Sequence, residues 1–189
     1  MKNFYILLLT LSIASLSFGQ ELMLNGDFES WDDPSTPTSY SKAESTLQET
    51  VEFHGGANSA KHTGGTKDIA QTVTGIIPGE IYTISLWYKF QEAGNARMWS
   101  TWKAGTTTLT DNADVLHPST YLDSSGTTWV EYSVTLTAPA TADNFYFEVR
   151  TYGTAVVYWD DFSVFKEATV TPPLLITTSV CATATSVRL

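Results

Sequence analysis

Large apolar residues recur at every second position of IYTISLWYKF, residues 81–90, and this pattern limits the folds that the chain can adopt. Successive side chains of an extended strand point to opposite faces. One face would carry Tyr82, Ile84, Leu86, Tyr88 and Phe90, and the other Thr83, Ser85, Trp87 and Lys89. A period of two over ten residues predicts a β-strand with one face in a core.

A strand-like pattern rich in Thr, Val, Tyr, Phe and Trp extends over residues 21–166, without a long stretch of helical period. Nine strands are expected, at 21–30, 46–53, 59–63, 68–74, 81–90, 96–103, 129–137, 144–152 and 156–165. Glycine and proline punctuate the intervals between them. The sequence therefore predicts an all-β fold of two antiparallel sheets packed face to face, with the connection 104–128 as an ordered loop over one end.

The two ends of the chain differ from this pattern. Residues 1–19, MKNFYILLLTLSIASLSFG, are typical of a secretory signal peptide: a basic residue, an apolar run and a small-x-small cleavage site. They are too short for a membrane anchor. We expect export of a domain at 20–166, followed by a Thr/Ser/Pro-rich linker or an incomplete further module at 167–189. The single cysteine, Cys181, lies in that last segment and cannot form an internal disulfide.

The net charge of the chain restricts the kinds of molecule that it can bind. Ten basic against twenty acidic residues give a formal net charge of −10. This average charge repels a phosphate backbone, so we expect no nucleic acid partner. The abundant carboxylates are possible oxygen ligands for a hard cation.

Aromatic rings on the expected outer faces are concentrated on three strands. The outward sets are Trp87 and Lys89 in the first, Arg97 and Trp99 in the second, and Tyr146, Glu148, Arg150 and Tyr152 in the third. Aromatic faces beside planar charged groups match a pyranose, which has an apolar C–H face and a rim of hydroxyls. Two interpretations stay open: these rings bind a sugar, or they are partly buried under the long loop.

Acidic residues lie near both ends of the domain. Alternation slips between Asp160 and Asp161 in VYWDDFSVF, as a β-bulge would produce. If the first and last strands pair, Glu29 would join these two carboxylates in an oxygen site suited to Ca²⁺. Ordinary turn chemistry and solvation of strand ends explain the same residues without a metal.

Six motifs occur in order: NGDFES, HGGANSAKHTGG, QTVTGIIPGEIYTISLWYKF, TTWVEYSVTLTAP, FYFEVRTYG and VYWDDFSVF. Together they resemble the CenC-like carbohydrate-binding modules of families 4 and 9, in the galactose-binding-like jelly-roll superfamily, over about residues 22–165. The stretches NARMWSTWKAG and DNADVLHPSTYL are similar to modules that accompany nuclease or other catalytic domains in secreted bacterial proteins.

The resemblance implies a jelly-roll β-sandwich with a sugar-binding surface and a structural Ca²⁺. It implies that the strands holding Trp87, Trp99 and residues 146–152 lie in one sheet, with SAKHT beside them, so that Lys61 faces the same ligand. It also implies that Glu29 and either Asp160 or Asp161 hold the metal, together with main-chain carbonyls of residues 55–58.

No catalytic constellation is evident: the acidic residues lack the spacing of a glycosidase pair, and the three histidines lack metal-ligand spacing. We therefore expect a secreted, non-catalytic module that attaches an associated enzyme, such as a glycoside hydrolase, to a polysaccharide or oligosaccharide. The alternative is a structural or adhesive spacer domain of a multidomain secreted protein, with no sugar binding of its own.

Overall fold

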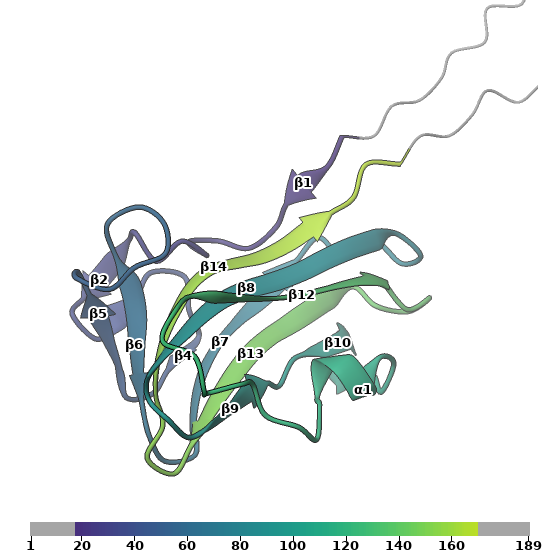
Figure 1. Ribbon diagram of the computed structural model, residues 1–189. Coiled ribbons are helices and arrows are strands. Elements are labelled where there is room, and N and C mark those ends of the chain that lie inside the picture. The colour runs from purple at the N-terminus through teal and green to yellow at the C-terminus, as the bar shows by residue number, and fades with distance from the viewer. Residues whose placement is uncertain (1–17, 170–189) are drawn as a thin grey trace, which may run out of the picture.

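Two antiparallel sheets and one short helix make up the computed structural model, which describes residues 18–169 (Figure 1). One sheet contains β1 (Gln20–Glu21), β5 (Thr46–Glu49), β6 (Ser59–Thr63), β8 (Ile81–Glu92), β12 (Val130–Thr137) and β14 (Val156–Lys166). The other contains β4 (Lys42–Ala43), β7 (Lys67–Thr74), β9 (Asn95–Met98), β10 (Thr101–Ala104), β11 (Thr107–Thr108) and β13 (Asn144–Tyr152). A separate hairpin joins β2 (Trp31–Asp33) to β3 (Thr36–Pro37), and α1 spans Ala113–Leu116.

Strand order defines the sandwich. The first sheet runs β12-β8-β14-β6-β5, with β1 also on β14, and we call it the β8 sheet. The second runs β11-β10-β13-β7-β4, with β9 also on β13, and we call it the β13 sheet. The all-β, two-sheet antiparallel jelly-roll prediction is confirmed.

Three predicted strands differ from the observed ones. Of the predicted strand 21–30, only Glu21 lies in a strand, at the end of β1. Asn25 and Phe28 both have a φ of 52°, a left-handed conformation that interrupts an extended chain. The strand at 46–53 ends at Glu49. The strand at 96–103 divides around Ser100, whose Oγ donates to the Glu148 carbonyl and accepts from the Glu148 N–H.

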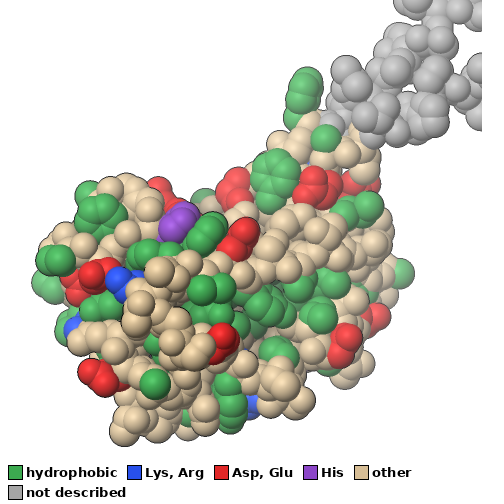
Figure 2. All heavy atoms as spheres, viewed as in Figure 1, with side chains coloured by type: hydrophobic (Ala, Val, Ile, Leu, Met, Phe, Trp, Pro, Cys, Tyr) green, Lys and Arg blue, Asp and Glu red, His purple; other side chains and the backbone are tan. Residues whose placement is uncertain are grey.

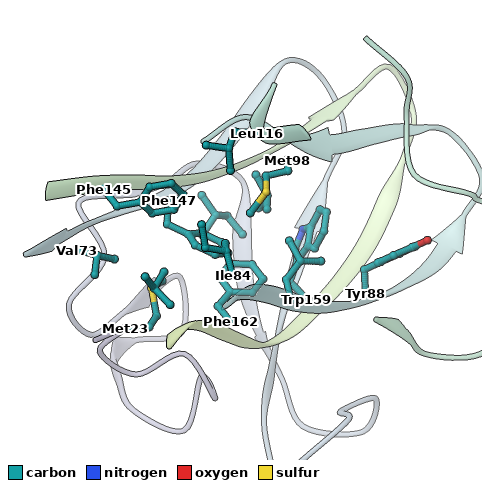
Figure 3. Packing of buried hydrophobic residues seen from close by; sticks show 14 of the residues in the cluster. Met23, Val73, Ile84, Tyr88, Met98, Leu116, Phe145, Phe147, Trp159 and Phe162 are labelled. Carbon is teal, nitrogen blue, oxygen red and sulfur yellow. The ribbon is translucent and has the colours of Figure 1, made fainter. Parts of the chain in front are cut away.

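Large aromatic side chains fill the space between the sheets (Figure 3). The largest fully buried ones are Trp102, Trp159, Tyr82, Phe28, Phe145 and Phe147. Trp102 makes edge contacts with Phe145 of its own sheet, at 4.7 Å between ring centroids, and with Tyr82 at 5.8 Å, and the second contact joins the two sheets. At a typical 3–5 kcal/mol per buried aromatic side chain, truncation of any of these rings would cost a large part of the stability of such a domain.

Pairing around β8 decides where the next segment goes. β12 lies along one edge of β8 and β14 along the other. Since both edges are occupied, residues 95–104 cannot continue in this sheet, and they cross to pair with β13. The side of the sandwich between β12 and β10 is then closed by the connection 105–129. Leu116 from this connection is buried, and the Val115 carbonyl accepts from the Tyr132 hydroxyl, which confirms an ordered loop.

Residues 1–17 and 170–189 fall outside the described part of the chain, and with them most of the predicted signal peptide, almost all of the predicted linker and Cys181. Within residues 18–169, no helix has the length and apolar character needed to span a membrane. Figure 2 shows few positive side chains on the visible face, while hydrophobic ones gather around β8 and β12.

Candidate functional site

The outer face of the β13 sheet, which we call the β13 face, combines aromatic and charged side chains. These side chains include Lys42, Asp68, Arg97, Trp99, Lys103, Tyr146, Glu148, Arg150 and Tyr152. Their alternation with inward Phe145, Phe147 and Val149 places them outside the core. The parity prediction for Arg97, Trp99 and the four residues of β13 is therefore right.

Trp99 lies at the centre of the aromatic part of this face. Its backbone N–H donates to the Glu148 carbonyl at 2.7 Å, which holds the break between β9 and β10 against β13. The guanidinium carbons of Arg97 and Arg150 lie 4.1 and 4.8 Å from its ring centroid. A ring contact with His117, at 4.9 Å between centroids, ties this tryptophan to the loop after α1.

Tyr146 and Tyr152 extend the aromatic row along β13. The ammonium of Lys103 lies 4.5 Å from the Tyr146 ring centroid. The Tyr152 hydroxyl accepts from Nε and Nη2 of Arg97, and its ring contacts Tyr121 at 5.5 Å between centroids. The row therefore runs along β13 from the Lys103 end to the loop that holds Tyr121.

A network of charges lies beside the rings. Lys42 pairs with Asp68, and Arg150 pairs with Glu148, each at 2.5 Å. The side chains of Asp68 and Glu148 are 9% and 5% exposed, whereas those of Lys42 and Arg150 are 39% and 26% exposed. Burial raises the pKa of Glu148, and the hydrogen bond from Arg150 opposes that rise. The carboxylates thus form a lower layer that holds two more accessible cations.

One oxygen in this network lacks a hydrogen bond. Arg150 Nε lies 3.1 Å from Asp68 Oδ1, but its single hydrogen points to Glu148 Oε1. Within the described residues, Asp68 Oδ1 is a buried side-chain acceptor without a donor. An unsatisfied buried acceptor is costly, typically 1–3 kcal/mol. Such exceptions call for a functional or structural explanation.

A shallow hollow of about 460 Å³ continues the β13 face beyond Tyr146. It is lined by Thr72, Thr74, Lys103, Gly105, Thr106, Asp143 and Asn144. Hydroxyl, amide, ammonium and carboxylate groups in one hollow can both donate to and accept from a polyhydroxylated ligand.

Trp87, Lys89 and Lys61 do not belong to this face. They lie on the outer face of the β8 sheet, because β8 and β6 both pair with β14. The predicted single sheet for Trp87, Trp99 and residues 146–152 is therefore wrong. The prediction fails because β12 and β14 occupy both edges of β8, so that the segment with Trp99 pairs in the other sheet, on the opposite side of the sandwich.

Trp87 is also covered by the protein itself. The His54 ring stacks on it at 3.7 Å and 14°, and Trp129 lies 5.9 Å from the same histidine. The loop that carries His54 is tied down further by a pair between Lys89 and Glu52 at 2.5 Å. His54 therefore occupies one face of the Trp87 ring, while Trp87 and Trp99 are both partly buried.

The predicted metal ligands converge on the loop 54–58. β1 pairs with β14 as expected, and a register shift after Asp160 confirms the predicted bulge. Glu29 Oε1 accepts from the N–H groups of Ala57 and Asn58, and Asp160 Oδ2 accepts from those of His54 and Gly55. Asp161 Oδ2 lies 2.6 Å from His54 Nδ1.

In this arrangement the predicted ligands accept hydrogen bonds from the loop. The loop turns N–H groups, not carbonyls, toward Glu29 and Asp160, and residues 18–169 contain no group of three or more His, Cys, Asp or Glu side chains placed to hold a metal. Burial raises the pKa of Asp160 to about 6. For Glu29, burial acts to raise the pKa, but the Ala57 and Asn58 donors outweigh it and lower the value. The calcium site stays a prediction.

Sequence reasoning missed Lys42, Asp68, Lys103 and Tyr121. Alternation in KDIAQTVT, residues 67–74, places Asp68 on the same side as Thr72 and would have revealed its outward position. Lys42 gave no such signal, since β4 has only two residues. Lys103 was outward by parity but was not linked to Tyr146, because that contact depends on the pairing of β10 with β13.

Comparison with known proteins identifies the family of the chain. A family model described as a carbohydrate binding domain, CBM_4_9, matches residues 20–155. The chain therefore belongs to this family of non-catalytic carbohydrate-binding modules. No curated protein matches the chain.

Solved structures of carbohydrate-binding modules share the fold. A family 16 module is 20% identical with a TM-score of 0.53, covering 76% of this chain and 98% of its own. A family 61 module solved with β-1,4-galactotriose is 12% identical with a TM-score of 0.55, covering 78% and 99%. The CBM22-1 xylan-binding domain of Paenibacillus barcinonensis Xyn10C is 14% identical with a TM-score of 0.53, covering 79% and 96%.

Proposed function

We propose that this protein is a secreted, non-catalytic module that binds a polysaccharide or oligosaccharide through the β13 face and thereby holds an associated enzyme at its substrate. Membership of the carbohydrate-binding family supports the sugar-binding part. The signal-like residues 1–19 support secretion, and the linker-like composition after residue 166 supports attachment to a further domain.

One observation carries the choice of face. On the β13 face, half-buried rings lie next to buried carboxylates that are paired with more accessible cations, and one carboxylate oxygen there is an acceptor without a donor. A sugar needs flat apolar surface for its C–H face and paired donors and acceptors for its hydroxyls. The outer face of the β8 sheet has a tryptophan as well, but His54 already stacks on it.

Calorimetric titration tests the choice with matched tryptophan variants. The ligands are soluble glucan, xylan, mannan and galactan, together with polygalacturonate and alginate. We expect wild type to bind at least one of them, and Trp99→Ala and Tyr146→Ala to weaken that binding by at least about tenfold, the loss typical of a central aromatic contact. Trp87→Ala is the control, since it removes an outward tryptophan from the other sheet.

Two results would contradict the proposal. Absence of heat with every polymer would leave the spacer alternative as the better description. Loss of binding in Trp87→Ala, with Trp99→Ala unaffected, would move the site to the β8 sheet.

A further inference from the structure

Arg97 and Arg150 lie directly opposite each other on β9 and β13. Side chains at directly opposite positions have Cβ atoms about 4.5–5.5 Å apart, and like charges there are destabilising. Both guanidinium groups contact the indole ring of Trp99. The face that we propose binds sugar therefore has two arginines at one tryptophan, of which Arg150 is paired with Glu148.

Arg97 lacks an anionic partner among the described residues. Its Nη1 donates to the Pro118 carbonyl, and its Nε and Nη2 donate to the Tyr152 hydroxyl. Rings of Trp99, Tyr121 and Tyr152 surround it within 5.1 Å of its guanidinium carbon. All these neighbours are neutral, so its charge is positioned but not compensated.

Lys103 repeats the arrangement at the other end of the face. Its ammonium contacts the Tyr146 ring, and no ion pair joins it to a carboxylate within residues 18–169. It also lines the hollow beyond Tyr146. The β13 face thus has one uncompensated cation at each end of its aromatic row.

Charge is divided unequally between the two sheets. The strands of the β8 sheet contain six acidic and three basic residues, as the whole composition would suggest. The strands of the β13 sheet contain two acidic and five basic residues. Both of those acidic residues, Asp68 and Glu148, are nearly buried below Lys42 and Arg150. Among the strand residues of the described chain, the outer layer of the β13 face is therefore cationic.

We propose that the ligand is an anionic glycan, whose negatively charged group is held between Arg97 and Arg150 while its sugar rings lie along the aromatic row. This inference rests on the proposed function and adds the ligand class to it. Guanidinium groups bind carboxylate and sulfate in a planar, bidentate manner. An anion would compensate the charge of Arg97, which a neutral sugar would leave without a counter-charge. A uronate carboxylate and a sulfate ester share this chemistry.

Pairs of polymers that differ only in charge distinguish the contribution of the anionic group from that of the sugar rings. Polygalacturonate and alginate are compared by calorimetry with their carboxyl-reduced forms, and dextran sulfate with dextran. We expect wild type to bind the charged member of at least one pair at least about tenfold more tightly, with affinity that falls as salt is raised. Preference within the carboxylate pairs indicates a uronate, and preference within the sulfate pair indicates a sulfate ester.

Variants locate the effect. Arg97→Gln should weaken binding of the charged polymer by about tenfold or more, as expected for loss of a charge-assisted hydrogen bond. Lys103→Gln should act in the same direction and does not disturb the packing around Trp99. Lys61→Gln, which removes the same charge from the other sheet, should leave affinity unchanged.

The outcomes distinguish this inference from the function on which it rests. Equal or tighter binding of the neutral member of every pair overturns the anionic ligand and leaves sugar binding intact. Equal affinity of wild type, Arg97→Gln and Lys103→Gln for a charged polymer also overturns it. Absence of binding to all charged and neutral polymers overturns both.

Discussion

At the scale of single residues, alternation was a reliable guide to which side chains leave the core. It placed Arg97, Trp99 and Glu148 outside the sandwich, where the structure has them, and it left Phe145 and Phe147 inside. Alternation reports only the side of a strand, because its period of two is the same in every sheet. It cannot say which of two sheets a strand joins, and for Trp87 and Trp99 this was the decisive point.

His62 is a buried titratable residue with a defined effect on stability. Burial lowers its pKa from 6.5 to about 4, and its ring accepts a hydrogen bond from Trp159 Nε1 at 3.3 Å. Between pH 6.5 and 4, His62 is therefore protonated in the unfolded chain but remains neutral in the folded protein. Stability from the neutral ring is complete above pH 6.5 and is lost as the pH falls toward 4.

We expect this residue to make the protein about 2 kcal/mol less stable at pH 5 than at pH 7. Urea unfolding of wild type and His62→Gln at both pH values measures the effect, since other titrating groups cancel in the comparison. The same pH dependence in both proteins would show that His62 is not the group responsible.

At the scale of elements, the connections decided what the strands alone could not. β8 was predicted well, but the crossing of residues 95–104 to β13 follows from long-range pairing on both edges of β8. The conformation of the loop 54–58 likewise could not be predicted from the local sequence pattern. Its N–H groups bind Glu29 and Asp160, which are distant in sequence, and its His54 covers Trp87.

Gly56 tests how tightly that loop is held. It has a φ of +62°, and a Cβ at this position would overlap Glu29 Oε1. Gly56→Ala therefore adds backbone strain of about 1–2 kcal/mol and also displaces the carboxylate from the Ala57 and Asn58 donors.

Gly105→Ala is the matched control, because Gly105 has a φ of +58° but no atom within 4 Å of a Cβ. Chemical denaturation should show Gly56→Ala to be less stable than Gly105→Ala by at least about 1 kcal/mol. Equal losses in the two variants would mean that the Glu29 contact contributes nothing.

At the scale of the whole molecule, fold class followed from many weak signals that agreed: strand pattern, turn residues and motif order. The binding face did not follow, because it depends on side chains from five separate segments, β4, β7, β9, β10 and β13. Only their pairing brings Lys42 to Asp68 and Arg97 to Arg150. The cationic outer layer of the β13 face results from this pairing of strands. It cannot be inferred from the negative net charge of the whole chain.

The most direct test of the central claim, that the β13 face binds the ligand, is an NMR titration of the six tryptophan indole N–H signals with an oligosaccharide from the calorimetric panel. We expect the Trp99 signal to shift in proportion to saturation, and the signals of Trp87 and of buried Trp102 and Trp159 to stay in place. A saturable shift at Trp87 with none at Trp99 would contradict the account.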